Sequence, residues 1–441
     1  MAKLMCYGGA GNATGANFLL ELSDQKILID CGMQQGGESA HVHNRQTFQY
    51  DPASINFLFI THAHIDHVGL IPKLVHNGFK GTIYSTPETK ALAELLLLDA
   101  VKIGREEENP LYTTQDVENS LSLWQTLEYH APHDLPAGRQ VSGFTVELFD
   151  AGHVLGSSML KFTTPGGKSM LFTGDLGNSP SPLLKEREKV SGVDYILMES
   201  VYGDRNHENR EEREERFKLI VSDAIKRNGA LLIPAFSLER AQIILSLLDD
   251  LFEAKVIPTV PVYLDSPLAI KITAIYERAI GGEPFDFKEL KYIQSAHESR
   301  EIEKEPGAKI IIAGSGMSTA GRILGHEAHY LPDPNSTILL MGYQAAGTLG
   351  RQIEEGMKKV IIDDQPVTIR AHVEKISGFS GHADSDALVN FVSENEKSLK
   401  KVFVAMGETH SQIFLAQRLR DELNVDAIAT EEGKSYEVDL G

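Results

Sequence analysis

Short apolar runs that end in a polar residue recur through the first 200 residues. They predict buried strands that carry a functional side chain at their carboxyl ends. A helix is expected over Thr89–Ala100, where the apolar stretch has helical length and good helix formers. A turn-rich loop without an assigned function is expected at HDLPAGRQVSG (133–143). The predicted strands are KILIDCG (26–32), NFLFITH (56–62), KSMLFTGD (168–175) and VDYILMES (193–200).

The pattern changes after residue 207. A charge run, ENREEREER (208–216), predicts the solvated face of a helix. Beyond it, strand-like runs alternate with helical patterns such as LERAQIILSLLDDLF (238–252). This alternation indicates a doubly wound, mostly parallel sheet, in which ligands bind at the carboxyl ends of the strands. Its strands are expected at GALLIPAFS (229–237), VPVYLDS (260–266), AKIIIAGSGM (308–317) and STILLMGYQ (336–344).

We therefore predict an α/β protein in which one domain interrupts another. The interrupted domain comprises residues 1–205 and 370–441, and residues 206–369 form the inserted domain. The reason for joining the two outer parts is that chemically active side chains reappear near the end of the chain. They lie in SGFSGHADSD (377–386) and VFVAMGETHSQ (402–412).

Composition limits the classes of function. The chain has 441 residues, 42% hydrophobic and 24% charged, which suits two folded domains. The net charge of -20 excludes an overall basic surface, so phosphate binding requires a local group of basic side chains, N–H groups or metal ions. Cys6 and Cys31 predict buried thiols rather than a disulfide framework. Without a signal peptide or about 18 consecutive apolar residues, we expect a cytoplasmic protein with no membrane segment.

Metal-binding side chains are concentrated in FITHAHIDHVGL (59–70), which contains His62, His64, Asp66 and His67. Two histidines two residues apart point the same way on an extended chain. A tight turn or helix start then brings the following aspartate and histidine to a neighbouring position, so one segment offers ligands to two adjacent metal ions. Imidazole and carboxylate suit zinc. A chance surface cluster is disfavoured because an apolar strand precedes the segment and an apolar helix start follows it.

Three further residues complete this candidate site. His153 lies in a glycine-flanked turn, and Asp175 follows a strand, where a carboxylate can bridge two cations. Asp30, also at a strand end, is expected to orient a histidine ligand. Taken alone, His153 is equally consistent with a core or surface histidine, and Asp30 with a simple capping residue.

The site residues described above, together with the strand-rich N-terminal region, resemble those of the metallo-β-lactamase superfamily. They are Asp30, His62, His64, Asp66, His67, His153 and Asp175. That resemblance implies an αββα sandwich with a dinuclear zinc site and hydrolysis by a metal-bound hydroxide. The motifs ESVYGDR, FSGHAD and GETH, with the α/β insertion, are similar to the β-CASP branch, which cuts nucleic acids. The likeness extends through AFSLERAQ, DSPLA, GSGMSTAGR and GYQAAGTLGR, so it covers almost the whole chain.

The resemblance implies a role for each site residue. Glu199 and His382 match the acidic motif and the following histidine of the branch. His382 would protonate the leaving oxygen, Glu199 would keep that imidazole charged and oriented, and Asp66 would orient the nucleophilic water. On spacing alone, a strand-end salt bridge for Glu199 and a helix cap for His382 stay open. The implied ligands are His62, His64 and His153 for one zinc ion, Asp66, His67 and His410 for the other, and Asp175 as the bridge.

The last ligand, His410, favours RNA over DNA as the substrate, because DNA-repair nucleases of the branch usually carry an apolar residue there. Phosphate contacts are expected at strand ends of the inserted domain, from a Gly/Ser loop with successive N–H groups and from two arginines. A plain turn and structural ion pairs are the alternatives. These candidate phosphate-binding residues are Arg240, Ser315, Gly316, Met317 and Arg351.

We therefore expect a ribonuclease with two zinc ions (Zn²⁺) that leaves 5′-phosphate and 3′-hydroxyl ends through a metal-bridging hydroxide. The resemblance is greatest to short, two-domain bacterial RNA-processing members, similar to ribonuclease J and the mRNA 3′-end cleavage endonuclease. The sequence leaves open endonuclease against 5′-exonuclease, the RNA preference and the oligomeric state, with a homodimer as one option. The alternatives are a DNA nuclease of the branch, a small-molecule ester or thioester hydrolase, and a non-catalytic RNA-binding subunit.

Overall fold

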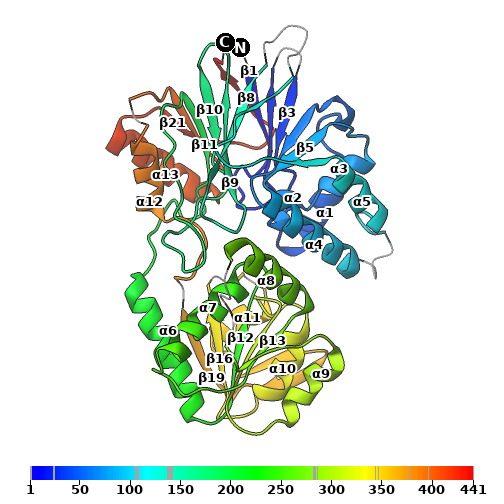
Figure 1. Ribbon diagram of the computed structural model, residues 1–441, viewed down its shortest axis with the longest axis vertical. Coiled ribbons are helices and arrows are strands. Elements are labelled where there is room, and N and C mark those ends of the chain that lie inside the picture. The colour runs from blue at the N-terminus through cyan, green and yellow to red at the C-terminus, as the bar shows by residue number, and fades with distance from the viewer. Residues whose placement is uncertain are drawn as a thin grey trace. The chain divides into compact units, whose positions relative to one another are not determined.

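The computed structural model describes residues 2–440 apart from residues 23–24, 105–108, 137–142, 282–284, 286, 343, 346, 377 and 396 (Figure 1). The chain forms two compact units. The first unit comprises Met1–Asn206 and Gly381–Gly441, and the inserted unit comprises His207–Ser380. The predicted α/β class is confirmed in both.

Two seven-stranded sheets form the first unit, and in each sheet one half is parallel and the other antiparallel. The first sheet has the order β22 (Ser435–Val438), β1 (Ala2–Gly8), β2 (Asn17–Glu21), β3 (Lys26–Ile29), β4 (Phe57–Phe59), β5 (Thr82–Ser85) and β6 (Trp124–Thr126). The second has the order β21 (Ala427–Ala429), β20 (Lys401–Val404), β11 (Tyr195–Met198), β10 (Ser169–Phe172), β9 (Ser158–Thr163), β8 (Thr145–Asp150) and β7 (His133–Asp134).

Helices cover the outer faces of the two sheets, which makes the αββα sandwich (Figure 1). On the side of the first sheet they are α1 (Gly37–Arg45), α2 (Ile65–Val68), α3 (Ile71–His76), α4 (Pro87–Ile103) and α5 (Thr114–Ser122). On the side of the second sheet they are α12 (Ser385–Ser393) and α13 (Thr409–Leu423). None of the described helices is long and apolar enough to cross a membrane.

Strand β10 shows why apolar and polar residues do not alternate along the predicted strands. Met170 and Phe172 pack into the core between the two sheets, whereas Leu171 packs into the core under α12 and α13. Because successive side chains of a strand point to opposite faces, a strand covered on both sides must be apolar throughout. Both cysteines are buried thiols, as predicted, and burial raises the pKa of Cys6 to about 12.

The inserted unit is built on a six-stranded sheet whose described pairings are all parallel, as predicted. Its order is β14 (Leu290–Tyr292), β13 (Val262–Asp265), β15 (Lys309–Ala313), β12 (Ala230–Pro234), β16 (Thr337–Met341) and β19 (His372–Ile376). A separate hairpin pairs β17 (Lys359–Ile362) with β18 (Gln365–Thr368). The helices are α6 (Arg210–Lys226), α7 (Arg240–Glu253), α8 (Pro267–Ile280), α9 (Ala296–Glu301), α10 (Arg322–Tyr330) and α11 (Leu349–Glu354).

The boundary between the units differs from the sequence-based one at its second crossing. We expected the first unit to resume at residue 370, but β19 pairs with β16 and so belongs to the inserted sheet. The chain returns to the first unit at Gly381. Within the loop predicted at 133–143, His133–Asp134 pairs with β8, and residues 137–142 lie outside the described part of the chain.

A close backbone contact positions the histidine-rich turn that follows β4. Ala16 N–H donates to the Asp66 carbonyl, Cys31 N–H donates to the His67 carbonyl, and Met33 N–H donates to the Ile65 carbonyl. These bonds bring Gly32 so close to the turn that a Cβ atom there would lie 1.5 Å from the Asp66 carbonyl oxygen. Position 32 therefore has no room for a side chain. The chain after β3 holds the start of α2 in place through these backbone contacts.

Gly32→Ala is expected to lower the free energy of unfolding by at least about 2 kcal/mol, because a methyl group there overlaps backbone that cannot move aside. Thermal or urea denaturation followed by circular dichroism measures the effect. Gly104→Ala is the matched control, since a Cβ at Gly104 meets no atom within 4 Å and its φ is -76°. Equal stability of the two variants would contradict this account of the turn.

Candidate metal centre and active site

The site lies where several strands of the first unit end. His62 follows β4, His64 is the N-cap residue of α2, and His67 lies within that helix. The second sheet contributes Asp175 after β10 and Glu199 after β11. In this unit, as predicted, polar side chains of the site follow the carboxyl ends of buried strands.

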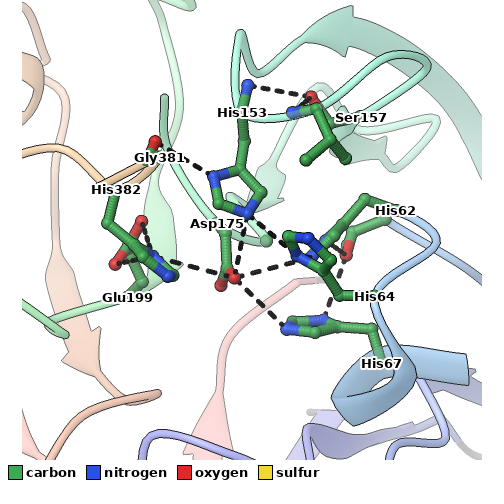
Figure 2. Close-up of polar contacts among 12 residues, drawn as sticks. His62, His64, His67, His153, Ser157, Asp175, Glu199, Gly381 and His382 are labelled. Carbon is green, nitrogen blue, oxygen red and sulfur yellow. Dashed lines mark hydrogen bonds and ion pairs between the residues drawn. The ribbon is translucent and has the colours of Figure 1, made fainter. Parts of the chain in front are cut away.

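One carboxylate oxygen lies at the centre of the histidine cluster (Figure 2). Asp175 Oδ2 is 3.5 Å from the Nε2 atoms of His62, His67 and His153. His64 approaches with its other nitrogen, since its Nδ1 lies 3.1 Å from Nε2 of His62 and 3.2 Å from Nε2 of His153. His62, His64, His153 and Asp175 thus form a group whose ligand atoms lie within 4.8 Å of one another.

Neighbouring groups orient three of these imidazoles. Nδ1 of His153 lies 3.1 Å from the Gly381 carbonyl oxygen, and Nδ1 of His62 lies 3.1 Å from the Thr61 hydroxyl. Nδ1 of His67 lies 2.8 Å from Asp30 Oδ2. A proton held at Nδ1 by such an acceptor leaves the lone pair at Nε2, which is the atom that faces Asp175.

Asp30 occupies the position expected of an orienting carboxylate. It is buried, and its second oxygen, Oδ1, accepts the Thr61 N–H at 2.8 Å. Its backbone has a φ of 59°, in the left-handed region that asparagine and aspartate tolerate better than other side chains. Asp30 therefore connects the end of β3 to the histidine turn through Thr61 and His67 together.

Burial and charge set the protonation of the cluster. Burial, with the neighbouring His67, holds the pKa of His62 well below its ordinary value, and burial does the same for His64. Burial also opposes the charged form of His67, but the Asp175 and Asp30 carboxylates outweigh it and raise the pKa of His67 well above its usual range. Burial would raise the pKa of Asp175, yet the surrounding imidazoles hold it well below its ordinary value.

The donor set fits a zinc ion. Four ligands at zinc-to-nitrogen distances of about 2.0–2.1 Å in a tetrahedron have ligand atoms about 3.3 Å apart. The separations of 3.1, 3.2 and 3.5 Å within the cluster agree with that spacing. The chemistry agrees as well, because neutral imidazoles with exposed lone pairs and one ionised carboxylate are zinc ligands.

Glu199 and His382 form a second pair on the other side of Asp175 (Figure 2). Nδ1 of His382 lies 3.1 Å from Glu199 Oε2 and 3.8 Å from Asp175 Oδ2. Glu199 is fully buried and also accepts the Leu176 N–H at 2.6 Å. Burial would lower the pKa of His382, but the two carboxylates raise it to about 10. The imidazole is therefore charged at neutral pH.

Asp66 lies beside the same cluster. Burial raises its pKa, the nearby His67 lowers it, and the charge of Asp175 raises it further. Its backbone carbonyl is held by Ala16, as described above. The structure thus brings Asp66 to the electrostatic environment of His67 and Asp175.

His410 does not lie with the predicted ligands. It stands in the first turn of α13 with its side chain 78% exposed, and its nearest described carboxylate is Asp204, at 3.9 Å from Nε2. After β20, Met406 is buried in the hydrophobic core between the two sheets. The turn at Gly407 and Glu408 carries the chain out to the surface before His410 is reached. Its use as a ligand, and the preference for RNA drawn from it, have no support in the geometry.

The two candidate phosphate-binding arginines have protein partners. Arg240 is buried and donates from Nη1 to the Met341 carbonyl at 3.1 Å, and Arg351 pairs with Glu355 at 2.7 Å. In the Gly/Ser loop, the Ser315 hydroxyl accepts the Thr319 N–H at 2.9 Å. The Gly316 carbonyl accepts from Gln344, and the Met317 carbonyl accepts the Gly350 N–H. These contacts match the structural alternatives of an ion pair and a turn.

Sequence inspection missed the residues that hold His382. Gly177 and His382 form a β-bridge, and Asn178 N–H donates to the Gly381 carbonyl at 2.8 Å. The same carbonyl faces His153, so one glycine serves both halves of the site. Backbone contacts across more than 200 residues leave no spacing pattern that inspection can detect.

Comparison with known proteins agrees with this arrangement. A metallo-β-lactamase superfamily domain matches residues 19–184, a Beta-Casp domain matches residues 241–353, and a Zn-dependent metallo-hydrolase RNA specificity domain matches residues 366–430. Ribonuclease TTHA0252 of Thermus thermophilus is 33% identical over 430 residues, which cover 95% of this chain and 96% of that protein. The chain belongs to the β-CASP branch of the metallo-β-lactamase superfamily. It is therefore a member of a family of metal-dependent hydrolases.

This β-CASP protein is also similar to a transcription termination factor and to a solved structure of unknown function. Transcription termination factor FttA of Methanothermobacter thermautotrophicus is 30% identical over 449 residues, covering 95% of this chain and 69% of that one. A crystal structure of a protein of unknown function from Enterococcus faecalis superposes with a TM-score of 0.58 at 14% identity and covers 99% of both chains. At that identity the match supports the fold alone.

In the metal-free β-CASP protein, the pKa of His382 is expected to be near 10 and to fall in Glu199→Gln, which removes the nearer carboxylate charge. NMR titration of the histidine ring protons measures it, with the His382 signal assigned by its loss in His382→Gln. Because the folded pKa is raised, this group stabilises the fold fully below its ordinary pKa near 6.5, and the contribution is lost as pH rises through about 10. An unchanged titration in Glu199→Gln would contradict the pairing.

Proposed function

We propose that this β-CASP protein is a zinc-dependent ribonuclease that hydrolyses phosphodiester bonds and leaves 5′-phosphate and 3′-hydroxyl ends. The observation that carries the proposal is the adjacency of two groups around Asp175. On one side lie imidazoles suited to zinc, and on the other lies a charged imidazole, His382, held by Glu199. The name of the Thermus thermophilus relative and the RNA specificity domain support RNA as the substrate.

Two zinc ions would be held within the cluster. His62, His64 and His153 with Asp175 would hold one, and Asp66 and His67 with Asp175 would hold the other. When bound, such ions lower the pKa of a water molecule and neutralise negative charge on the phosphate. His410 is left out of this set because its side chain lies in solvent.

His382 would serve as the general acid. Its Nδ1 lies 3.1 Å from Glu199 Oε2 and 3.8 Å from Asp175 Oδ2, so Nε2 is the atom proposed to donate the proton, and the side chain is 23% exposed. A 3′-alkoxide has a high proton affinity, so protonation as the bond breaks lowers the barrier. Glu199 acts through His382, because it keeps the imidazole protonated and turned toward the substrate.

The competing functions differ in what they require of this second pair. A thioester hydrolase expels a thiolate, which is far less basic than a 3′-alkoxide, so it gains little from a charged His382. An alkyl-ester hydrolase expels an alkoxide, so the ester assay is needed to separate it from a nuclease. A DNA nuclease requires the same acid as a ribonuclease, and with His410 on the surface no residue of the site separates the two. RNA is preferred on the relatives alone, so the experiment includes DNA.

The zinc-loaded protein is expected to cleave single-stranded RNA, and His382→Ala is expected to reduce the rate about 10²- to 10⁴-fold. One RNA labelled separately at its 5′ and 3′ ends distinguishes internal cuts from release of 5′-terminal nucleotides. The matching DNA and a nitrophenyl ester are assayed beside it.

Each outcome has a defined meaning. Cleavage of DNA alone would replace the proposal with a DNA nuclease, and ester hydrolysis without polymer cleavage would replace it with a small-molecule hydrolase. Wild-type rates in His382→Ala would remove the general acid from the mechanism. His372→Ala is the matched control, since that histidine is exposed on β19.

Asp30→Asn is expected to weaken zinc binding about 10- to 100-fold, because asparagine keeps the left-handed backbone but removes the charge beside His67. Competition with a chromogenic chelator measures the affinity, and circular dichroism checks the fold. Asp134→Asn changes an exposed carboxylate on β7 and is expected to leave zinc affinity as it was. Equal affinities for the two variants would mean that Asp30 does not support a ligand.

A further inference from the structure

The surface around His410 is the strongest feature that the proposed catalytic centre leaves unused. The His410 and Phe414 rings are 6.3 Å apart, and Phe414 is 41% exposed although phenylalanine is usually buried. They project from the first turns of α13, so the helix holds them in place. A single exposed apolar residue needs no explanation, but this one belongs to a longer series of flat side chains.

Contacts connect this surface to His382. Asp204 accepts from the Ser411 hydroxyl at 3.1 Å and lies 3.9 Å from His410. Arg205 Nη1 is 3.6 Å from Asp204, and the Arg205 guanidinium lies over the Tyr202 ring, 4.8 Å from its centroid. All of these residues belong to the first unit.

The series ends beside the proposed general acid. The Tyr202 and His382 rings are 6.4 Å apart with an angle of 34° between their planes. Tyr202 also pairs with Asp384 in a β-bridge, so the ring is carried by backbone that is hydrogen-bonded to the segment of His382. We call Tyr202, Arg205, His410 and Phe414 the ring strip.

The chemistry of the ring strip suits unpaired bases. Bases stack on aromatic rings and on guanidinium planes, and such stacking is the usual means of holding a single strand without reading its sequence. Phosphate groups suit the ring strip less, because the Asp204 carboxylate lies 3.6 Å from Arg205 Nη1 and offsets the charge of that guanidinium. The strip therefore matches the base side of a strand.

We propose that the ring strip binds bases of the RNA on the 5′ side of the scissile bond. This inference rests on the proposed function. The assignment to the 5′ side follows from the position of His382, the proposed general acid. The 3′-oxygen that accepts a proton from His382 belongs to the nucleotide on the 5′ side of the cut. Tyr202 adjoins His382, so that nucleotide meets Tyr202, and the bases before it reach Phe414.

The test uses the zinc-loaded full chain and one RNA whose cleavage site has been mapped. Single abasic nucleotides are placed one at a time on either side of the cut, and KM and kcat are measured. An abasic nucleotide at one upstream position is expected to raise KM about tenfold in the wild type, as the loss of one stacked base would. Phe414→Ala is expected to raise KM similarly with intact RNA.

Coupling between the two changes decides the proposal. If Phe414 stacks on that base, the abasic RNA and Phe414→Ala together cost no more than either alone. Phe414→Tyr, which keeps a ring, is expected to retain the wild-type KM. Ile413→Ala is the control, because Ile413 is 51% exposed on the same helix but carries no ring. Stacking is not screened by salt, so the Phe414→Ala effect is expected to persist as salt increases.

The contrary outcomes are distinct. Independent, multiplying effects of the two changes, or coupling to a position on the 3′ side of the cut, would overturn the ring strip while leaving the ribonuclease intact. If Ile413→Ala raised KM as much as Phe414→Ala, the effect would belong to the surface of α13 in general and not to the ring strip. If the wild-type chain cuts no RNA at all, the proposed function fails, and the ring strip fails with it.

Discussion

The arrangement of the first unit depends on one buried carboxylate. Asp175 attracts four imidazoles, and without its charge the burial of so many basic groups together would oppose folding. The two sheets meet around this attraction, since the histidines of the first turn come from one sheet and Asp175 and Glu199 from the other. The first sheet thus supplies imidazoles and the second supplies carboxylates at the edge where the site lies.

Local patterns in the sequence were sufficient for most of the elements. Strands covered on both faces, such as β10 and β15, leave uninterrupted apolar runs, and the polar residue after each run marks the strand end. Histidines two residues apart before a helix start predicted the turn at His62 to His67, and the structure brings these side chains to Asp175. These features are short-range, so one stretch of sequence contains them.

Features that depend on distant partners were less accessible. His410 was expected among the metal ligands, but the turn after β20 carries the chain to the surface before α13 begins, which no local pattern predicts. Arg240 has the residue type of a phosphate contact, but its environment is the carbonyl of Met341, a hundred residues away. The return to the first unit was placed too early because β19 belongs to a sheet whose order no sequence pattern specifies.

The chain order of the site has a consequence for synthesis in the cell. The proposed metal ligands and Glu199 all precede the insertion, whereas His382 follows it, held by the bridge to Gly177. The two ends of the insertion are joined within the first unit, where Asp386 N–H donates to the Asn206 side chain and Ser385 N–H donates to the Arg205 carbonyl. A nascent chain therefore carries the proposed metal ligands long before it has the proposed proton donor. If His382 is the acid, as proposed, full cleavage activity requires the whole insertion to have been synthesised.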